Sequence, residues 1–233
     1  MSENIAVIGA GIAGLTAARR LADGGHAVTV YEKSGGTGGR LSTRRTEFGS
    51  FDHGAQYITV KGEAFQAMMS DLIGSGAAGL WTPDGKTTDR NWHVGTPGMS
   101  SLVKPLLDGF VVKKRTRITA VQRQADTIVC TDESGQSAGF DRVIVAIPTP
   151  QAHALLIPVD PAFGVLEKVV FLPCWTGMFG FSEPVASLPD HYRGEHCDSI
   201  SWLARDCSKP DRTGVEMICA QAGAHSTLAA SRL

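Results

Sequence analysis

The sequence predicts an α/β fold in which a parallel-sheet domain is interleaved with a second domain built on an antiparallel sheet. The first observation is an apolar run, Ile5 to Ile8, that leads through a glycine turn into apolar residues at helical spacing from Ile12 to Leu21. The second is Val143 to Ile147, an unbroken apolar run that ends at Pro148. Such a run is typical of a strand buried on both faces, and we expect it beside the first strand.

The elements that follow the first helix continue this pattern. The run from Ala27 to Tyr31 is typical of a second strand, which closes a βαβ unit. Glu63 to Ile73 has helical periodicity and begins a different layer. Ser100 to Leu107 predicts another helix, which Pro105 should bend or end early.

Short β-like segments lie on both sides of the apolar run at 143–147, and those after Pro150 suggest an antiparallel second domain. These segments are 110–113, 118–121, 128–131, 175–181, 199–204 and 215–220. Asp132 to Gly135 resembles a tight hairpin connection. The predicted domains are a first domain of residues 1–58 and 105–150 and a second domain of residues 59–104 and 151–233.

A glycine motif joins the first strand to the first helix. Gly9 to Gly14 reads G-x-G-x-x-G, the fingerprint of a Rossmann unit that binds a dinucleotide. Gly9 permits a tight turn, Gly11 lets the backbone approach a pyrophosphate, and Gly14 allows the helix to pack closely on the strand. Glu32 ends the second strand, where a carboxylate accepts hydrogen bonds from a ribose diol. In this context a chance glycine turn is the weaker interpretation.

A second glycine motif decides between NAD and FAD, which both satisfy the first. Gly35 to Arg40 reads G-G-T-G-G-R and resembles the G-G-R segment of flavin amine oxidases and their relatives. Its amides and the Arg40 guanidinium would close over the same pyrophosphate from the other side. A flexible surface loop is the alternative, and we expect the stretch from Ser34 to Arg40 to be ordered only when a ligand binds.

Several longer segments narrow this resemblance to the renalase family, including its bacterial members. The segments that carry it are 38–45 (GGRLSTRR), 52–57 (DHGAQY), 92–100 (WHVGTPGMS), 199–206 (SISWLARD) and 208–210 (SKP). The resemblance covers essentially the whole chain, and we expect residues 1–58 and 105–150 to form an FAD-binding domain and residues 59–104 and 151–233 a substrate domain. Its most specific parts are the linked glycine motifs and the segment at 52–57.

The resemblance implies roles for individual residues. Together with the motif residues Gly9, Gly11, Gly14 and Gly38, the residues that would contact FAD are Ala13, Glu32, Gly39, Arg40, Gln56, Tyr57 and, through its backbone at the adenine, Val112. Tyr57 has an alternative role as a core aromatic, and Gln56 as a buried structural amide. Trp92 and Met99 either line the substrate side of the flavin or belong to the core.

The renalase resemblance implies an activity in which dihydronicotinamide dinucleotide isomers are oxidised to NAD(P)+ and oxygen is reduced to hydrogen peroxide. We expect no catalytic side chain, because the flavin carries the chemistry and the fold supplies orientation. One alternative is a flavin amine oxidase, which an aromatic cage would support, although 7% aromatic residues argues mildly against it. Another is an inactive fragment that binds a nucleotide. The expected partners are oxygen and a small-molecule substrate, either a dinucleotide or an amine.

The C-terminal end departs from the pattern of these flavoproteins. They usually carry a further glycine and acidic motif, near a last helix whose N-terminus faces the flavin. After residue 220 the sequence runs through Gly223 and His225 to Leu233 without that motif. The sequence therefore favours a truncated chain over a divergent ending, and we expect the truncated form to bind FAD poorly.

Composition excludes several other classes. A formal net charge of −1 gives no electrostatic case for nucleic acid, and no apolar run reaches the length of a membrane span. Five cysteines without a C-x-x-C pair favour reduced thiols in the cytoplasm. His191, His196 and Cys197 lie close together in sequence, but their spacing matches no zinc template, so no metal is expected.

Overall fold

The computed structural model describes residues 1–86, 90–194, 199–212, 216–223 and 227. The chain forms two compact units, each built from two separate stretches of sequence. Unit 1 consists of residues 1–39 and 106–171, and unit 2 of residues 40–105 and 172–233. The chain therefore passes from one unit to the other three times.

The compact units share the interleaved plan of the predicted domains but have other bounds. Unit 1 stops at Gly39 instead of residue 58, because residues 43–52 form a hairpin that belongs to unit 2. It continues to Phe171 instead of residue 150, because a helix at 149–156 packs on its sheet. The division into an FAD-binding domain and a substrate domain stays a prediction.

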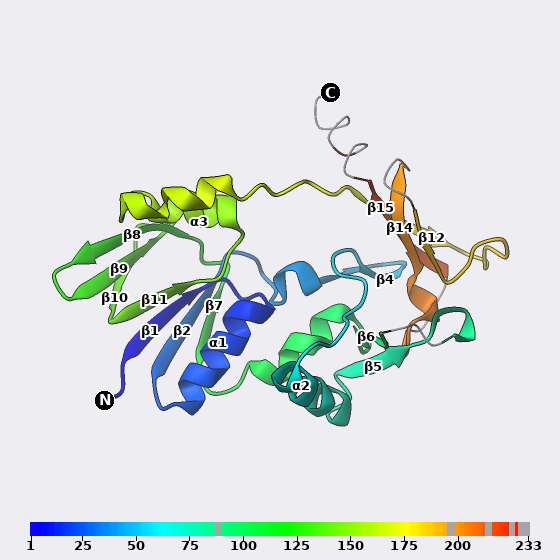
Figure 1. Cartoon of the computed structure of the whole chain (residues 1–233), viewed down its shortest axis with the longest axis horizontal. Helices are drawn as coiled ribbons and strands as arrows, with labels where there is room; N and C mark the ends of the chain where they lie inside the picture. Colours follow the sequence, from blue (N-terminus) through cyan, green and yellow to red (C-terminus); the bar gives the residue numbers. More distant parts are fainter. Residues whose placement is uncertain (87–89, 195–198, 213–215, 224–226, 228–233) are drawn as a thin grey trace. The chain divides into compact units, whose positions relative to one another are not determined.

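A four-stranded parallel sheet forms the centre of unit 1, with the strand order β11-β1-β2-β7 (Figure 1). Its elements are β1 (Asn4–Ile8), α1 (Ile12–Asp23), β2 (Ala27–Glu32), β7 (Val111–Lys114) and β11 (Arg142–Val145). The expected βαβ unit is therefore present, and the α/β fold class is confirmed. As predicted, β11 lies beside β1, with Ala6 opposite Val143.

The burial of the apolar run at 143–147 differs from the expectation. Every residue of this run is half-buried, whereas Ile5 and Val7 of β1 are at most 1% exposed. The cause is the position of β11 at the edge of the sheet, with one neighbouring strand instead of two. An apolar run therefore predicted the strand and its partner but not its complete burial.

A second, antiparallel sheet completes unit 1, in the order β10-β9-β8. Its strands and the helices that follow are β8 (Ile118–Gln124), β9 (Thr127–Asp132), β10 (Ser137–Phe140), α3 (Thr149–Leu156) and η4 (Pro161–Lys168), where η denotes a 3-10 helix. The predicted hairpin turn after β9 is held by the Asp132 carboxylate, which accepts hydrogen bonds from the backbone N–H groups of Ser134 and Gln136. Residues of both sheets, among them Ala6, Tyr31 and Phe140, share one apolar core.

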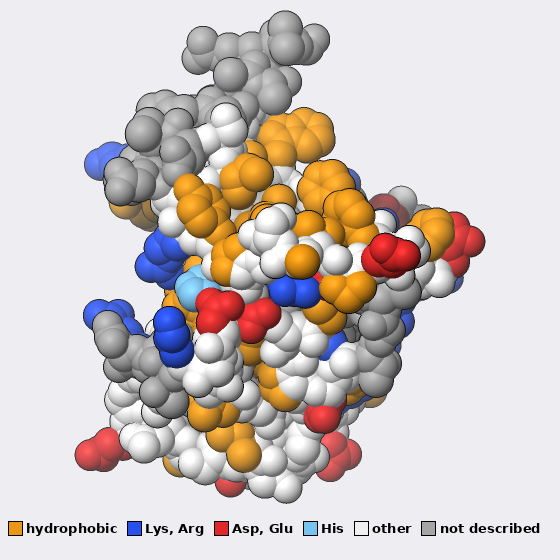
Figure 2. Space-filling model, turned by 90° about the vertical axis from the view of Figure 1, so that its right-hand side faces the viewer, with side chains coloured by type: hydrophobic (Ala, Val, Ile, Leu, Met, Phe, Trp, Pro, Cys, Tyr) orange, Lys and Arg blue, Asp and Glu red, His pale blue; other side chains and the backbone are white. Residues whose placement is uncertain are grey.

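Unit 2 contains a four-stranded antiparallel sheet in the order β12-β15-β14-β13, which agrees with the expected antiparallel second domain. These strands are β12 (Thr176–Phe181), β13 (His191–Arg193), β14 (Ile200–Arg205) and β15 (Glu216–Ala222), with η5 (Asp206–Ser208) after β14. Val215, which the sequence placed in the last strand, lies outside the described residues. On β12, Met178, Phe179 and Phe181 are 37%, 50% and 42% exposed, and Figure 2 shows hydrophobic side chains gathered on this side of unit 2.

Two hairpins and several helices make up the rest of unit 2. They are β3 (Thr43–Thr46) with β4 (Gly49–Asp52), α2 (Glu63–Gly74), β5 (Ala78–Trp81) with β6 (Trp92–Gly95), η2 (Pro83–Gly85) and η3 (Met99–Leu106). The predicted helix at 100–107 is a 3-10 helix instead, and it contains Pro105. A proline in this segment lacks the N–H that a regular helix would use, which favours the irregular form.

The glycine-rich stretch from Ser34 to Arg40 contacts the first glycine loop. The Gly38 N–H donates a 2.8 Å hydrogen bond to the Ala10 carbonyl. Gly11 and Gly38 form a parallel bridge, and η1 (Gly39–Leu41) follows directly. Backbone contacts therefore join the two glycine loops, and the dependence of their order on a ligand stays a prediction.

Within the described ranges, no helix is long and apolar enough to cross a membrane.

Candidate functional site

The turn between β1 and α1 needs two of its glycines for internal reasons. Gly9 has a φ of +108°, and a Cβ on it would lie 2.7 Å from the Ala146 carbonyl oxygen. A Cβ on Gly14 would lie 2.0 Å from the carbonyl oxygen of Gly9, which is far inside van der Waals contact. These two glycines therefore perform the turn and packing roles expected of them, whether or not a ligand is bound.

Gly11 has no such internal reason. A Cβ built on it would have no neighbour within 4 Å, and its φ of −76° and ψ of 176° suit any residue. Gly11 is the N-cap of α1, and α1 has neither a side-chain cap nor an acidic residue in its first turn. The main-chain amides at the start of the helix thus lie beside open space, an arrangement that suits an anion such as a pyrophosphate.

Glu32 is held at the end of β2, directly beside this turn. Glu32 is buried, at 8% exposed. Oε2 accepts a 3.0 Å hydrogen bond from the Ala10 N–H, and Oε1 accepts from the N–H and the hydroxyl of Ser34 at 2.8 and 2.7 Å. A carboxylate offers about four acceptor positions, so capacity is left for a ribose hydroxyl.

The second glycine loop packs against the first within unit 1. Gly38 is buried, and Gly39 has a φ of +55° with its Cβ position 3.3 Å from the Gly11 Cα. We call Gly9, Gly11, Gly14, Gly38 and Gly39 the glycine cradle. The residues present therefore fit the pyrophosphate and ribose of a dinucleotide, on the evidence of the open space at Gly11 and the uncapped helix.

Two further predicted residues lie in unit 1. Ala13 is exposed in the first turn of α1. Val112 is half-buried on β7, opposite Val30 of β2. Their contacts with FAD stay predictions.

The other predicted residues belong to unit 2. The exposed Arg40 lies in η1, and its carbonyl oxygen accepts a 2.8 Å hydrogen bond from the Ala55 N–H. A Cβ on Gly54 would lie 2.1 Å from that oxygen, so glycine is required there. The segment at 52–57 thus packs directly on the end of the second glycine motif.

Gln56 has the environment of a buried structural amide, the alternative that the sequence left open. The residue is 6% exposed, and its amide nitrogen donates to the carbonyl oxygens of Asp52 and Gly54. Its Oε1 accepts a 3.1 Å hydrogen bond from Lys209 Nζ. Any contact between its side chain and FAD would compete with these bonds.

Lys209 belongs to a buried ion network that the sequence prediction missed. We use this name for Asp52, Asp206, Lys209 and Arg212, whose charged side chains are at most 6% exposed. Lys209 Nζ lies 2.5 Å from Asp206 Oδ1 and 3.5 Å from Asp52 Oδ2, and Arg212 also pairs with Asp52. Asp206 and Lys209 lie in the segments at 199–206 and 208–210 that carried the resemblance. Spacing alone, however, does not reveal that the carboxylates of Asp206 and Asp52 are buried.

The charges around Asp52 determine its protonation. Burial by itself would raise the pKa of this carboxyl, but the Lys209 and Arg212 cations outweigh it. Hydrogen bonds from the Thr43 hydroxyl at 2.7 Å and the Met99 N–H at 2.9 Å act in the same direction. The pKa of Asp52 is therefore held below its ordinary value, and the group stays ionised at neutral pH.

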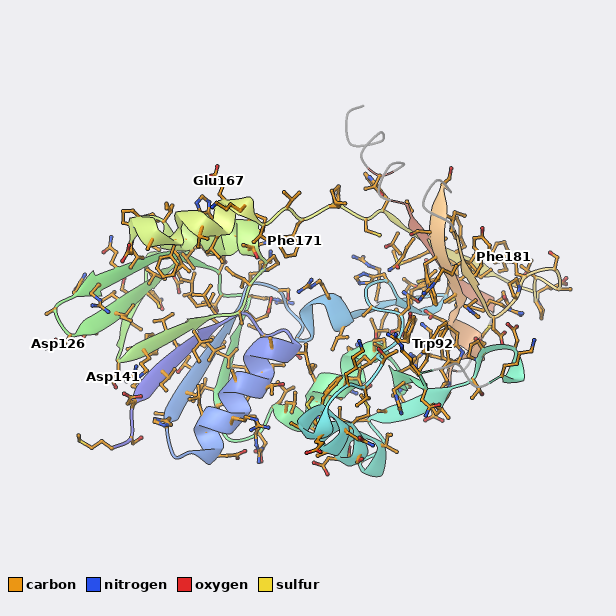
Figure 3. All side chains as sticks on the ribbon, in the orientation of Figure 1. Trp92, Asp126, Asp141, Glu167, Phe171 and Phe181 are labelled. Carbon is orange, nitrogen blue, oxygen red and sulfur yellow. The ribbon has the colours of Figure 1, made fainter. Side chains whose placement is uncertain are left out.

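Tyr57 and Trp92 come together in unit 2, in an aromatic cluster that also contains Trp81, His191 and Trp202. The Tyr57 and Trp92 rings are stacked, with centroids 4.1 Å apart and an interplanar angle of 13°. Trp202 lies 5.3 Å from Tyr57 and 5.5 Å from Trp92. Figure 3 labels Trp92 among the closely packed side chains of this unit. Trp202 was not predicted.

Met99 does not belong to this cluster. It is 0% exposed, and its sulfur accepts a 3.3 Å hydrogen bond from the Gly95 N–H. Of the two roles left open for Met99, the structure therefore favours the core over a substrate-lining position.

Other features of the described residues add no second centre. They contain no group of three or more side chains that could hold a metal ion. His196 and Cys197, named with His191 as a possible metal cluster, lie outside the described residues.

Unit 2 also has a polar cavity of about 220 Å³ that contains none of the predicted residues. It is lined by Thr43, Arg45, Ser50, Pro97, Gly98, Asp206, Cys207, Asp211, Arg212 and Met217.

Comparisons with known proteins agree with this geometry. A family model described as "NAD(P)-binding Rossmann-like domain" matches residues 7–72, which include the glycine cradle and Glu32. A second, described as "Flavin containing amine oxidoreductase", matches residues 73–220.

Solved structures of low sequence identity share the fold. Wild-type putrescine oxidase bound to putrescine has a TM-score of 0.71 at 12% identity, over 100% of this chain and 78% of that one. A Pyrococcus furiosus protein has a TM-score of 0.68 at 11% identity, over 94% of this chain and 79% of that one.

Two curated relatives match over a short segment. The 4,4'-diapophytoene desaturase (4,4'-diaponeurosporene-forming) of Staphylococcus haemolyticus is 48% identical over 56 residues, and that of Staphylococcus aureus strain Newman is 50% identical over 54 residues. These alignments cover 24% and 23% of this chain but 11% of each relative.

Proposed function

Because the chain belongs to the flavin containing amine oxidoreductase family, whose members normally bind FAD, we propose that it is an FAD-dependent oxidoreductase that oxidises a small amine. The observation that carries the cofactor proposal is the glycine cradle. Gly11 is glycine without an internal reason, at the uncapped start of α1. A pyrophosphate in front of that helix would explain both facts.

Each predicted contact residue has a part in this proposal. The amides at the start of α1, with Ala13 in its first turn, bind the pyrophosphate, and Arg40 approaches it from the second glycine motif. Glu32 accepts from the ribose hydroxyls and disfavours a 2′-phosphate by charge repulsion. The adenine meets the Val112 backbone, while Gln56 and Tyr57 belong to the segment assigned to the flavin.

When bound, FAD would accept a hydride from the substrate and pass the electrons to oxygen, which becomes hydrogen peroxide. The side chains of unit 2 then have the tasks of binding and orienting the substrate. The aromatic cluster supports the choice of an amine, because aromatic faces attract cations. An aromatic cage is also the feature that the sequence analysis expected of an amine oxidase.

A second candidate is the renalase-type oxidation of dihydronicotinamide dinucleotide isomers. Arg193 favours it, because its guanidinium lies beside Tyr57 and Trp202 and is suited to a phosphate. A dinucleotide would bring both a flat ring and phosphates to this surface.

The test is a flavin spectrum of the protein reconstituted with FAD, followed by peroxide release with each substrate class. We expect flavin absorbance bands and faster peroxide release with amines. Bands accompanied by faster oxidation of dihydronicotinamide isomers would replace the amine with the second candidate. A protein that stays colourless after reconstitution would overturn the oxidoreductase proposal and favour an inactive nucleotide-binding fragment.

A further inference from the structure

Arg193 holds a fixed guanidinium at the edge of the aromatic cluster. It lies on β13, and its Nη2 donates a hydrogen bond to the Tyr57 hydroxyl. Its Cζ lies 5.5 Å from the centroid of the Trp202 ring, within cation–π range. The residue is exposed, so two aromatic side chains orient a cation that solvent can reach.

The partners of Arg193 differ from those of the other arginines in this sheet region. Arg205 makes a two-point ion pair with Glu216, at 2.6 and 2.8 Å, and Arg212 pairs with Asp52. Among the residues that the structure describes, no carboxylate lies within ion-pairing distance of Arg193. A guanidinium has five N–H donors, and the hydrogen bond to the Tyr57 hydroxyl uses one of them.

The side chains next to this cation are aromatic. Tyr57 and Trp92 are each half-buried and stacked on one another, while Trp202 is 7% exposed. The Trp202 indole N–H is buried and has no hydrogen-bond partner in the described chain. A ligand that combines a planar or apolar part with an anionic group would satisfy both the rings and the guanidinium.

We propose that Tyr57, Trp92, Trp202 and Arg193 form a subsite for the anionic group of the substrate, a carboxylate or a phosphate. Arg193 is then a specificity-determining residue. Its guanidinium pairs with the anion through charge-assisted hydrogen bonds and repels amines that carry only positive charge. That the ligand is the substrate rests on the proposed oxidoreductase function, whereas binding of the anion does not.

Binding is measured by quenching of tryptophan fluorescence with three probes that share one ring: benzoate, phenyl phosphate and benzylamine. We expect both anions to bind better than benzylamine. Arg193→Gln should weaken anion binding by about tenfold or more, since charge-assisted hydrogen bonds contribute about 1.5 kcal/mol or more. Arg193→Lys, which keeps the charge but loses the fork, should recover part of the loss. Arg123→Gln, which removes an exposed guanidinium from β8 of unit 1, is the matched control and should change nothing.

The anion probes also identify the source of the negative charge. Preference for benzoate indicates an amine that carries a carboxylate, and preference for phenyl phosphate indicates a phosphorylated or dinucleotide substrate. Equal losses for all three probes in Arg193→Gln, or equal losses in Arg193→Gln and Arg123→Gln, would overturn the subsite.

Peroxide release from phenylalanine and phenethylamine, which differ by the carboxylate, separates this inference from the proposed function. If both anions bind through Arg193 but FAD is never taken up, the subsite stands and the oxidoreductase proposal fails. If phenethylamine is oxidised faster and Arg193→Gln leaves both rates unchanged, the amine oxidase function stands and the subsite fails.

Discussion

Unit 1 and unit 2 hold their predicted residues in opposite ways. In unit 1 the glycine cradle is main chain, and its defining feature is the side-chain volume that is missing at Gly11. In unit 2 the predicted residues Gln56 and Tyr57 lie in contact with a buried ion network and an aromatic cluster, which are made of side chains. The difference indicates that the predicted function of unit 1 depends on side-chain atoms that are missing, whereas that of unit 2 depends on side chains that are present.

The largest effect is expected from the buried ion network. Lys209→Met leaves Asp206 without its 2.5 Å partner and Asp52 with one cation fewer. Breaking a buried pair on one side costs about 3 to 5 kcal/mol, so urea unfolding should show a loss of that order. The control is Arg142→Gln in unit 1, which breaks an exposed pair with Glu3 and should have a much smaller effect. Equal losses in the two variants would contradict the contrast between the units.

The next effect concerns the packing glycine of the cradle. Gly14→Ala places a Cβ against the Gly9 carbonyl oxygen, so the helix must move away from β1. Overpacking of this kind costs about 1 to 3 kcal/mol, which thermal unfolding of the cofactor-free protein would detect. An unchanged melting temperature would show that the close approach of α1 to the turn is not required.

An effect of similar size is expected where cofactor binding alone is measured. Arg40→Ala should weaken FAD binding by more than Lys33→Ala, because a charge-assisted hydrogen bond contributes about 1.5 to 3 kcal/mol. Lys33 is exposed, and its Nζ donates to Gln151 instead. Flavin titration of both variants provides the comparison, and similar affinities would remove Arg40 from the pyrophosphate site.

The smallest effect is a dependence of the stability on pH, which arises from Asp52 in unit 2. Because the folded pKa of Asp52 lies below its unfolded value, its contribution to stability is complete above the unfolded value of about 3.9 and is lost as pH falls through the folded pKa. Urea unfolding at neutral pH and below pH of about 4 should show this loss in the parent protein. Asp52→Asn should reduce that pH dependence, whereas Asp126→Asn on an exposed turn should leave it unchanged.

The sequence predicted the turn of the glycine cradle better than the side-chain packing within unit 2, for a physical reason. A glycine loop is local, so the spacing of Gly9, Gly11 and Gly14 already specifies the turn. The packing around Tyr57 depends on residues more than 100 positions away, such as Trp202 and Arg193, and periodicity carries no information about such contacts. For the same reason the sequence revealed β11 as a partner of β1 but not its place at the sheet edge.

Sequence patterns carry no information about distant contacts, and this also explains Gln56 and Met99, for which the structure favours a structural role over contact with a ligand. Gln56 and Met99 lie in segments that resemble flavoproteins, so the resemblance suggested ligand contacts for both. Their side chains accept hydrogen bonds from Lys209 and Gly95, whose positions follow from the folded chain and not from the motif.

The most direct test of the account is the flavin content of Gly11→Ala after reconstitution with FAD. A methyl group at Gly11 meets no protein atom within 4 Å, so the variant should unfold at the same temperature as the parent. It should nevertheless lose most of its flavin absorbance, because the methyl group would occupy the space of the pyrophosphate. A Gly11→Ala protein that is as stable as the parent and binds FAD equally well would contradict the assignment of the glycine cradle to the cofactor.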